Sequence, residues 1–301
     1  MRFSVWPGPM QSWESVLALA RRAEETGWDG VWFADHFMPN RDDPRGDTLE
    51  CWATIAALAV AVPRVRLGTL VCGNTYRHPA VLANQAATVD VVCGGRFTLG
   101  IGAGWQRNEH DRYGIPFPST RERLERLDEA CQVIKLLTTT ERADFSGRYY
   151  ALDGAPLEPK PVQDPLPLLV GGGGEKVTLR IAAEHADAWN TWGNPDVMRH
   201  KVEVLEGHCE DLGRDPSTIQ RSANAFVYLR DDHAEVDRLR ASVPTSRSIV
   251  GTASELTDMM GAYRAAGIDE FIVPDFHLDD DRQRAELYDR FIEEVAAPLR
   301  D

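Results

Sequence analysis

The sequence predicts an α/β fold of the (β/α)8 (TIM) barrel class, formed by a single domain over residues 1–301. Three observations lead to this prediction. Short β-rich runs alternate with longer helical patterns, as in a parallel sheet built from βα units. There are eight such runs, which is the number of strands that closes a barrel. The chain length of 301 residues is also usual for this fold.

The boundaries of the elements follow from apolar runs and from end signals. Thr252 and Glu255 have the spacing of a helix capping box, and Gly27 and Gly267 stand where helices would end before a strand. The predicted strands span residues 2–6, 30–34, 65–71, 96–101, 167–171, 187–191, 223–229 and 270–273.

The interval between the fourth and fifth strands is too long for an ordinary βα unit. It contains one good helix, at about residues 119–137, then a polar hairpin-like stretch around residues 146–150 and a proline-rich segment. We expect residues 105–165 to be an insertion packed over the mouth of the barrel, and not a second domain.

Composition excludes several classes of protein. Nucleic acids and anionic membranes attract clustered lysine and arginine, whereas this chain has a formal net charge of -14. No segment has the length or hydropathy of a membrane span or of a signal peptide. Five cysteines without a C-x-x-C pair fit reduced, buried thiols better than disulfides or a zinc site. We therefore expect a cytoplasmic protein that binds neither nucleic acid nor membrane.

Catalytic residues of β/α barrels lie at the carboxyl ends of the strands. The second predicted strand ends in Asp35 and His36, a pair that can orient a ring or move a proton. A structural pair that fixes a loop explains the same residues equally well. Trp6 ends the first strand and Trp105 follows the fourth, so both are candidates for contact with a substrate.

Two glycine-rich segments also end strands. Gly100, Gly102 and Gly104 remove side chains from one face, which permits close approach by a flat ligand or by backbone. Gly171–Gly174 precede a helix that we expect to begin near Glu175, and free N–H groups there favour a phosphate site over a bare turn. The sequence contains no metal-binding constellation and no activated nucleophile motif, so the predicted chemistry belongs to a cofactor.

With these motifs assembled, the chain resembles the bacterial-luciferase-like oxidoreductases, and within them the branch that uses the deazaflavin coenzyme F420. The resemblance covers nearly the whole chain. The segments that carry it are Trp32–Phe37, Leu67–Val71 with Asn74–Pro79, Gly94–Phe97 leading to Gly102–Trp105, Glu158–Gln163 and Gly171–Gly174.

The resemblance implies roles for particular residues. It implies that Asp35 and His36 lie beside the cofactor ring and that a non-proline cis peptide at Leu70–Val71, in a bulge on the third strand, backs that ring. Gly171–Gly174 would hold the cofactor phosphate. The remaining positions implied for cofactor contact are Cys72, next to the bulge, and Asn108.

The resemblance also implies hydride transfer between F420 and a small organic substrate, with His36 exchanging the accompanying proton. Trp105 stands where the sugar-phosphate dehydrogenases of the family have a glutamate, which implies a more apolar substrate pocket. Members of the family often form homodimers. Two alternatives remain open: an FMN-dependent monooxygenase that uses O₂, and a barrel that binds a flavin without catalysis.

Overall fold

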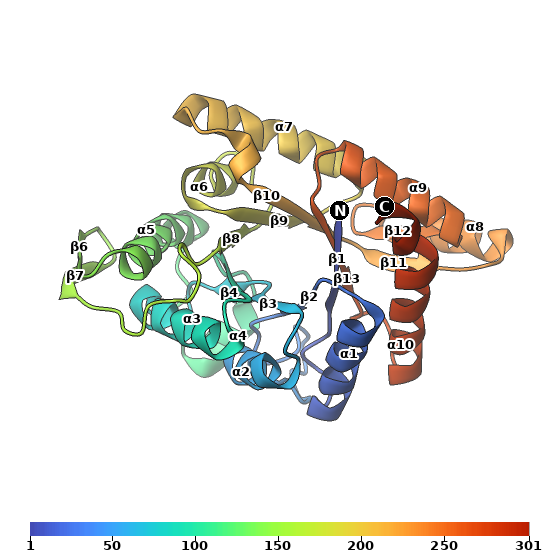
Figure 1. The fold of residues 1–301 in the computed structure, drawn as a ribbon, viewed down its shortest axis with the longest axis horizontal. Coiled ribbons are helices and arrows are strands. Elements are labelled where there is room, and N and C mark those ends of the chain that lie inside the picture. The colour runs from blue at the N-terminus through green and yellow to red at the C-terminus, as the bar shows by residue number, and fades with distance from the viewer. Residues whose placement is uncertain (301) are drawn as a thin grey trace.

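A computed structural model describes residues 1–300 and contains a closed barrel of parallel strands surrounded by helices (Figure 1). Pairing of the third strand with the next barrel strand closes the sheet, so the predicted fold class is confirmed. The barrel strands are β1 (Arg2–Trp6), β2 (Gly30–Phe33), β3 (Arg66–Thr69), β5 (Phe97–Gly102), β8 (Leu168–Gly171), β9 (Ala188–Trp192), β10 (Gln220–Asn224) and β13 (Glu270–Pro274). A two-residue strand, β4 (Cys72–Gly73), continues the third strand after a break.

The helices begin and end largely where the sequence signals them. The predicted capping box of Thr252 with Glu255 opens α9, and Gly27 ends α1 in the left-handed conformation with a φ of 85°. No helix among residues 1–300 has the length and hydropathy needed to cross a bilayer. The helices are α1 (Trp13–Thr26), α2 (Cys51–Ala61), α3 (Pro79–Cys93), α4 (Arg107–Tyr113), α5 (Thr120–Thr139), α6 (Thr178–His185), α7 (Pro195–Leu212), α8 (His233–Ser242), α9 (Ala253–Ala265) and α10 (Asp281–Arg290).

The seventh predicted strand, residues 223–229, is wrong in its boundaries. The barrel strand β10 ends at Asn224, and β11 (Phe226–Leu229) then pairs with β12 (Ser248–Gly251) in a separate two-stranded sheet. The Phe226 N–H donates to the Arg247 carbonyl at 2.8 Å, outside the barrel ladder. One continuous apolar run therefore serves two sheets, and the run itself does not mark where the chain changes partner.

The interval after the fourth barrel strand divides into two parts. The short helix α4 lies at the mouth, whereas the hairpin of β6 (Ala143–Ser146) and β7 (Ala151–Ala155) lies beside α5, at the edge of the molecule (Figure 1). The Glu129 side chain of α5 fastens the hairpin, because its carboxylate accepts the backbone N–H groups of Arg148 at 2.7 Å and Tyr149 at 2.9 Å. Only the first part of the insertion contributes to the mouth.

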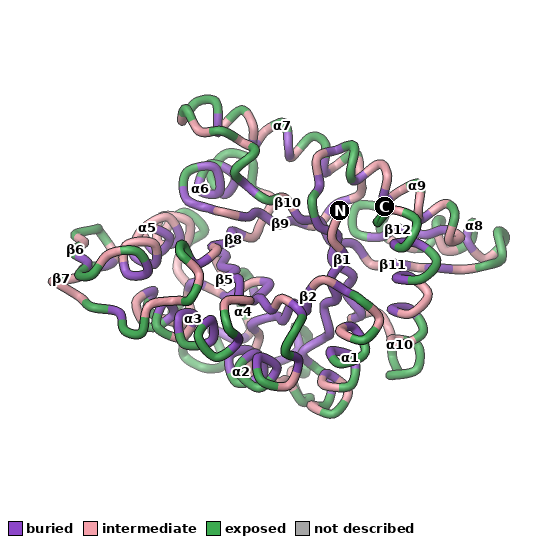
Figure 2. Tube along the Cα trace, in the orientation of Figure 1, coloured by how far each residue is buried: buried purple, intermediate pink, exposed green. Residues whose placement is uncertain are grey.

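The core has two layers, one between strands and helices and one inside the barrel, and the strands are buried over most of their length (Figure 2). Alternation along β1 shows the division, because Phe3 and Val5 pack against the helices while Trp6 points into the barrel. The five cysteines are all buried and unpaired, as expected. The inner cluster consists of Trp6, Trp32, Ala34, Leu70, Leu169, Ala188 and Ile272.

The alternating glycines of β5 make room for the third strand. The peptide bond between Leu70 and Val71 is cis, as the family resemblance implies, and the Val71 side chain occupies the space beside Gly100, Gly102 and Gly171. A Cβ on Gly100 would lie 2.0 Å from the Thr69 carbonyl oxygen, and a Cβ on Gly171 would lie 2.8 Å from Val71 Cγ1. The glycines are therefore required by close approach of backbone and of Val71.

We expect Gly100→Ala to lower the free energy of unfolding by about 1–3 kcal/mol, because no flexible group can yield to the new methyl. Gly207→Ala is the matched control, since a Cβ at this exposed position in α7 meets nothing within 4 Å. The control should raise stability by about 0.5–1 kcal/mol. Urea denaturation of the two variants tests the interpretation, and equal stability of Gly100→Ala and the wild type would contradict it.

Candidate functional site at the carboxyl ends of the barrel strands

A cavity of about 840 Å³ lies at the carboxyl ends of the strands. Its volume falls within the range of cofactor and small-molecule sites. The cavity contains most of the residues that the sequence selects, because they follow neighbouring strands of one barrel. Those that line it are Trp6, Asp35, His36, Leu70, Val71, Cys72, Trp105, Gly171, Gly172 and Gly173.

Asn108 and Gly174 do not line the cavity. The Asn108 amide donates to the Pro39 carbonyl at 2.9 Å, which ties α4 to the loop after β2. The Gly174 carbonyl accepts the Leu179 N–H at 3.0 Å, below the glycine loop. Their roles in cofactor binding stay predictions, and each has a structural contact of its own.

Both oxygens of the Asp35 carboxylate accept hydrogen bonds from protein groups. Arg77 binds both of its oxygens, at 2.6 and 3.1 Å, and the Gly73 N–H donates to it at 3.3 Å. Arg77 also reaches Glu50, the residue that caps α2, at 2.8 Å. Burial raises the pKa of Asp35 and the Arg77 charge opposes that effect. Asp35 therefore holds the segment after the bulge in place, although it lies at the cavity wall.

The glycine loop lines the cavity with Gly171–Gly173, and Lys201 lies beside it. Within residues 1–300 the N–H groups of Gly173 and Gly174 donate to no protein acceptor, whereas the Gly172 N–H binds the Asn190 carbonyl at 2.9 Å. Lys201 of α7 reaches the Gly173 carbonyl at 2.8 Å and Glu175 at 2.6 Å. The helix expected near Glu175 begins only at Thr178, because residues 175–177 form a turn. Free donors beside a lysine fit an anionic group of a cofactor.

His36 is held by a buried carboxylate that the sequence analysis did not select. Glu109 of α4 has no exposed surface, and its carboxylate lies 3.1 Å from His36 Nδ1. The Tyr76 hydroxyl and the Phe37 N–H also donate to Glu109. Burial disfavours the charge, but the hydrogen bonds from His36, Tyr76 and Phe37 outweigh burial and place the pKa of Glu109 below its usual range.

An ionised Glu109 determines the tautomer of His36. A carboxylate only accepts hydrogen bonds, so the proton of a neutral His36 ring belongs on Nδ1. Nε2 then keeps its lone pair for the cavity that His36 lines. This arrangement prepares His36 to accept a proton from a bound group. The Trp105 ring packs edge-on against the imidazole at 5.5 Å, and more than half of it stays exposed at the mouth.

Two functional residues escaped the sequence analysis for different reasons. Glu109 stands in the polar run Asn108–Tyr113, where nothing in the pattern separates a buried acid from exposed ones. Lys201 belongs to a long amphipathic helix and resembles the other surface lysines. His78 directly precedes α3 and caps it by accepting the Ala80 N–H, whereas its neighbour Arg77 pairs with Asp35.

A second buried carboxylate fixes the loop after β1. The Asp275 side chain, at the end of β13, accepts the Gly8 N–H and the Gln11 side-chain N–H, both at 2.8 Å. The loop between these residues contributes Pro9 and Met10 to the cavity. Burial raises the pKa of Asp275 to about 6. The wall formed by this loop therefore depends on a carboxylate that titrates near neutral pH.

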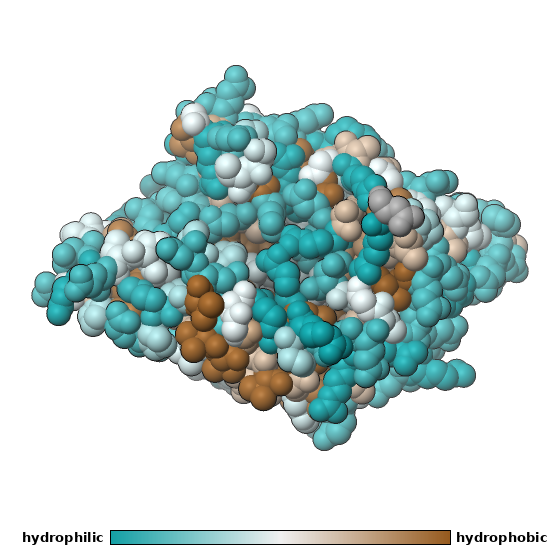
Figure 3. Space-filling view, viewed as in Figure 1, coloured by the Kyte–Doolittle hydropathy of each residue, from teal (hydrophilic) through white to brown (hydrophobic). Residues whose placement is uncertain are grey.

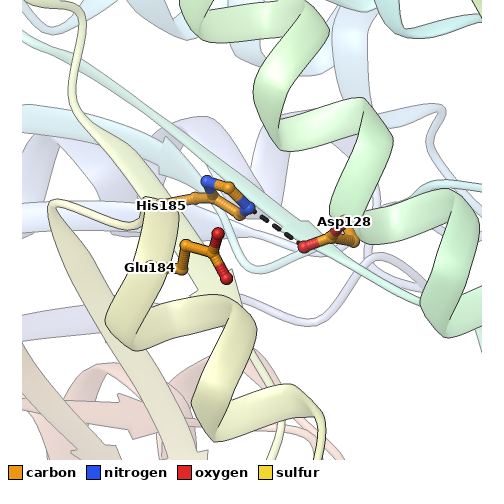
Figure 4. Close-up of side chains that lie close together, drawn as sticks. All are labelled: Asp128, Glu184 and His185. Carbon is orange, nitrogen blue, oxygen red and sulfur yellow. Dashed lines mark hydrogen bonds and ion pairs between the residues drawn. The ribbon is translucent and has the colours of Figure 1, made fainter. Parts of the chain in front are cut away.

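A cluster of Asp128, Glu184 and His185 lies outside this cavity, between α5 and α6 (Figure 4). His185 Nε2 binds Asp128 at 3.0 Å, and the Lys135 ammonium donates to the His185 carbonyl at 2.7 Å. These contacts join two barrel helices. The neighbouring lysine charge makes the cluster a poor cation site.

The chain is similar to a family of known proteins over most of its length. A model of the family described as luciferase-like monooxygenase matches residues 1–256. The chain belongs to this family. This match confirms the resemblance found in the sequence. The barrel, the cavity at its carboxyl end and the cis peptide are therefore features of a luciferase-like protein.

Relatives in this family carry the names of F420-dependent enzymes. An F420-dependent glucose-6-phosphate dehydrogenase of Kineococcus radiotolerans is 44% identical over 221 residues, which are 72% of this chain and 64% of the relative. An F420-dependent hydroxymycolic acid dehydrogenase of Mycobacterium tuberculosis is 31% identical over 73% of this chain and 61% of the relative. The matches thus span somewhat less than two thirds of either relative.

A solved structure supports the fold over the entire chain. An F420-dependent secondary alcohol dehydrogenase in complex with an F420-acetone adduct superposes with a TM-score of 0.84 and covers 100% of this chain and 99% of that protein. Because the sequence identity is 24%, this similarity supports a shared fold and no further property.

We expect Asp275→Asn to remove a pH-dependent component of stability. A carboxyl group whose folded pKa is raised stabilises the fold fully below its unfolded pKa of about 3.9, and the contribution is lost as pH rises through about 6. Between pH 4 and pH 6 the wild type should lose about 1–3 kcal/mol more than Asp275→Asn. Denaturation series at several pH values measure the difference. Asp237→Asn, at an exposed position, should keep the wild-type profile.

Proposed function

We propose that this protein is an F420-dependent oxidoreductase that transfers a hydride between the deazaflavin and a small organic substrate. The observation that carries the proposal is that three features meet at one cavity. They are the bulge at Val71, the glycine loop with free N–H donors, and His36 oriented by Glu109. The F420-dependent relatives support the choice of cofactor.

The residues present fit such a cofactor. The Gly173 and Gly174 N–H groups and Lys201 suit its phosphate, and the walls at Leu70 and Val71 are apolar and suit a flat ring. When bound, F420 supplies a ring that accepts or returns a hydride. The protein's own part is to bind both partners, exclude water and exchange the proton. His36 Nε2 would take the hydroxyl proton of an alcohol as its carbon loses a hydride, or return it in reverse.

The pocket walls favour a substrate less polar than a sugar phosphate. Several aromatic rings line the cavity. Trp6 packs against Trp192 at 5.7 Å and Phe276 at 4.8 Å, and Trp105 stands at the rim. The family resemblance implies that the sugar-phosphate dehydrogenases have a glutamate at the position that Trp105 occupies in this chain. A hydroxyl or carbonyl compound with an apolar body fits these walls.

Cofactor titration tests the proposal. F420 should bind at least tenfold more tightly than FMN, a difference of about 1.4 kcal/mol. His36→Ala should lower turnover about 10²–10⁴-fold while the dissociation constant of F420 changes less than threefold. Loss of deazaflavin absorbance with a panel of secondary alcohols gives the rate. His233→Ala, on the exposed start of α8, is the control.

Each alternative function predicts a different outcome. Tighter binding of FMN with O₂ consumption would mean a monooxygenase. Tight binding of F420 with no hydride exchange in either direction would mean a non-catalytic barrel. Full turnover in His36→Ala would remove the proton role from His36.

We further propose that the chain forms a cytoplasmic homodimer through α2 and α3. Helices usually expose charged residues to solvent, but the exposed faces of these two helices carry none (Figure 3). All five cysteines are free thiols, which fits a reducing compartment. The exposed residues are Ala53, Ala56, Ala57, Val60, Val81, Asn84, Thr88, Val91 and Val92.

Val92→Glu should convert a dimer to a monomer, because it places a charge in the centre of an apolar interface. Light scattering coupled to gel filtration measures the mass. Val92→Thr keeps the shape without a charge and should stay dimeric. A monomeric wild type, or a dimeric Val92→Glu, would rule out this interface.

A further inference from the structure

The barrel has a second cavity, at the end opposite to the candidate active site. Its volume is about 480 Å³, and its lining includes the first residues of several strands, among them Arg2, Arg66, Gln220 and Glu270. In β/α barrels this amino-terminal face usually serves stability and not catalysis. Here, however, the cavity is lined mainly by charged and polar side chains, whereas a purely structural end of the barrel would be filled by packed apolar side chains.

The lining of this cavity is positive within a strongly acidic chain. Four arginines, Arg2, Arg66, Arg96 and Arg221, face two carboxylates, Asp187 and Glu270. The whole chain has a formal net charge of -14. A local positive field in such a chain attracts small anions even though the net charge repels them.

Most of these charges have partners of their own. The Arg96 guanidinium donates to backbone carbonyls, including those of Val62 and Cys93. Arg221 pairs with Glu206 at 2.9 Å. Arg2 donates to Gln220 at 2.7 Å and lies 3.5 Å from Glu270.

Arg66 is the exception. Among residues 1–300 its guanidinium makes one hydrogen bond, to the Thr98 hydroxyl at 3.1 Å, and no carboxylate of this segment is within ion-pair distance. Burial, and then the charge of Arg2, lower the pKa of the Arg66 guanidinium. Four of its five N–H donors are therefore left without a protein acceptor, in a partly desolvated position beside a like charge.

Glu270 forms no ion pair with Arg66, although its charge partly offsets that of the guanidinium. One of its oxygens accepts hydrogen bonds from the Ser4 hydroxyl at 2.6 Å and from the Trp32 indole N–H at 2.9 Å. The other oxygen faces Arg2. The carboxylate is thus committed to the interior of the barrel, and the positive charge of Arg66 stays open to the cavity.

We propose that this amino-terminal cavity binds a phosphate-sized oxyanion, either free or as a phosphomonoester, through the guanidinium groups of Arg66 and Arg2. The planar donor fork of arginine matches paired oxygens of such an anion. An anion there would satisfy the open donors and relieve the repulsion between the two arginines. The site is separate from the glycine loop, which lies at the other end of the strands.

Calorimetric titration with orthophosphate, at constant ionic strength set by chloride, tests this site. The titration uses protein saturated with F420, so that the glycine loop is occupied, and is repeated without F420. One saturable site should persist in both cases. Arg66→Gln should weaken phosphate binding at least tenfold, and Arg64→Gln, an exposed neighbour paired with Glu24, less than twofold. A parallel titration with glycerol 3-phosphate distinguishes the free ion from an ester, and binding of either supports the site.

Thermal unfolding separates binding from a structural role. Phosphate should raise the unfolding temperature of the wild type and of Arg64→Gln but not of Arg66→Gln. Absence of saturable binding, or equal binding by Arg66→Gln, would overturn the proposal. If Arg66→Gln does not fold, Arg66→Lys decides, because it keeps the charge and loses the fork. A threefold or larger weakening supports the site, and undiminished affinity refutes it.

Discussion

The close packing of Val71 against its glycine neighbours is the constraint on which the active-site end of the barrel depends. Three positions on two adjacent strands, Gly100, Gly102 and Gly171, have no side chain because Val71 and the Thr69 carbonyl fill that space. The third strand bends there, resumes as β4 and exposes its backbone to the cavity. The Asp35–Arg77 pair then fastens the segment after the bend. A flat wall for a ring ligand results from packing inside the protein.

The second determinant is the buried carboxylate of Glu109. Trp105 stands at the rim before α4 begins, and the acid that contacts His36 is Glu109, within that helix. Because Glu109 is ionised, it fixes which nitrogen of His36 faces the cavity. The rim position therefore needs no acid, and the aromatic Trp105 occupies it. His36 and the aromatic Trp105 lie side by side at the mouth, which agrees with a substrate that has one polar group on an apolar body.

Much of this architecture was predictable from the sequence, and the failures have physical causes. Seven strands were located within a few residues, because a barrel strand is an apolar run ended by glycine or polar residues. Gly171–Gly174 and the Asp35–His36 pair were selected because functional residues of barrels lie at strand ends, and all of them except Gly174 line the cavity. The prediction of the seventh strand was wrong because the apolar residues 226–229 pair outside the barrel. A local sequence pattern does not show which strand such a segment pairs with. Glu109 and Lys201 were missed because burial of a charged residue depends on tertiary contacts.

The Glu50–Arg77 ion pair links the cofactor wall to the outer surface of the molecule. Glu50 caps α2, Arg77 precedes α3, and both belong to the network that holds Asp35. The same two helices carry the uncharged outer face. The cavity wall proposed to contact the cofactor ring and the proposed subunit interface are therefore two sides of one rigid unit. If association orders that unit, mass action couples the two equilibria, and the apparent affinity for the cofactor would rise with the concentration of the protein itself.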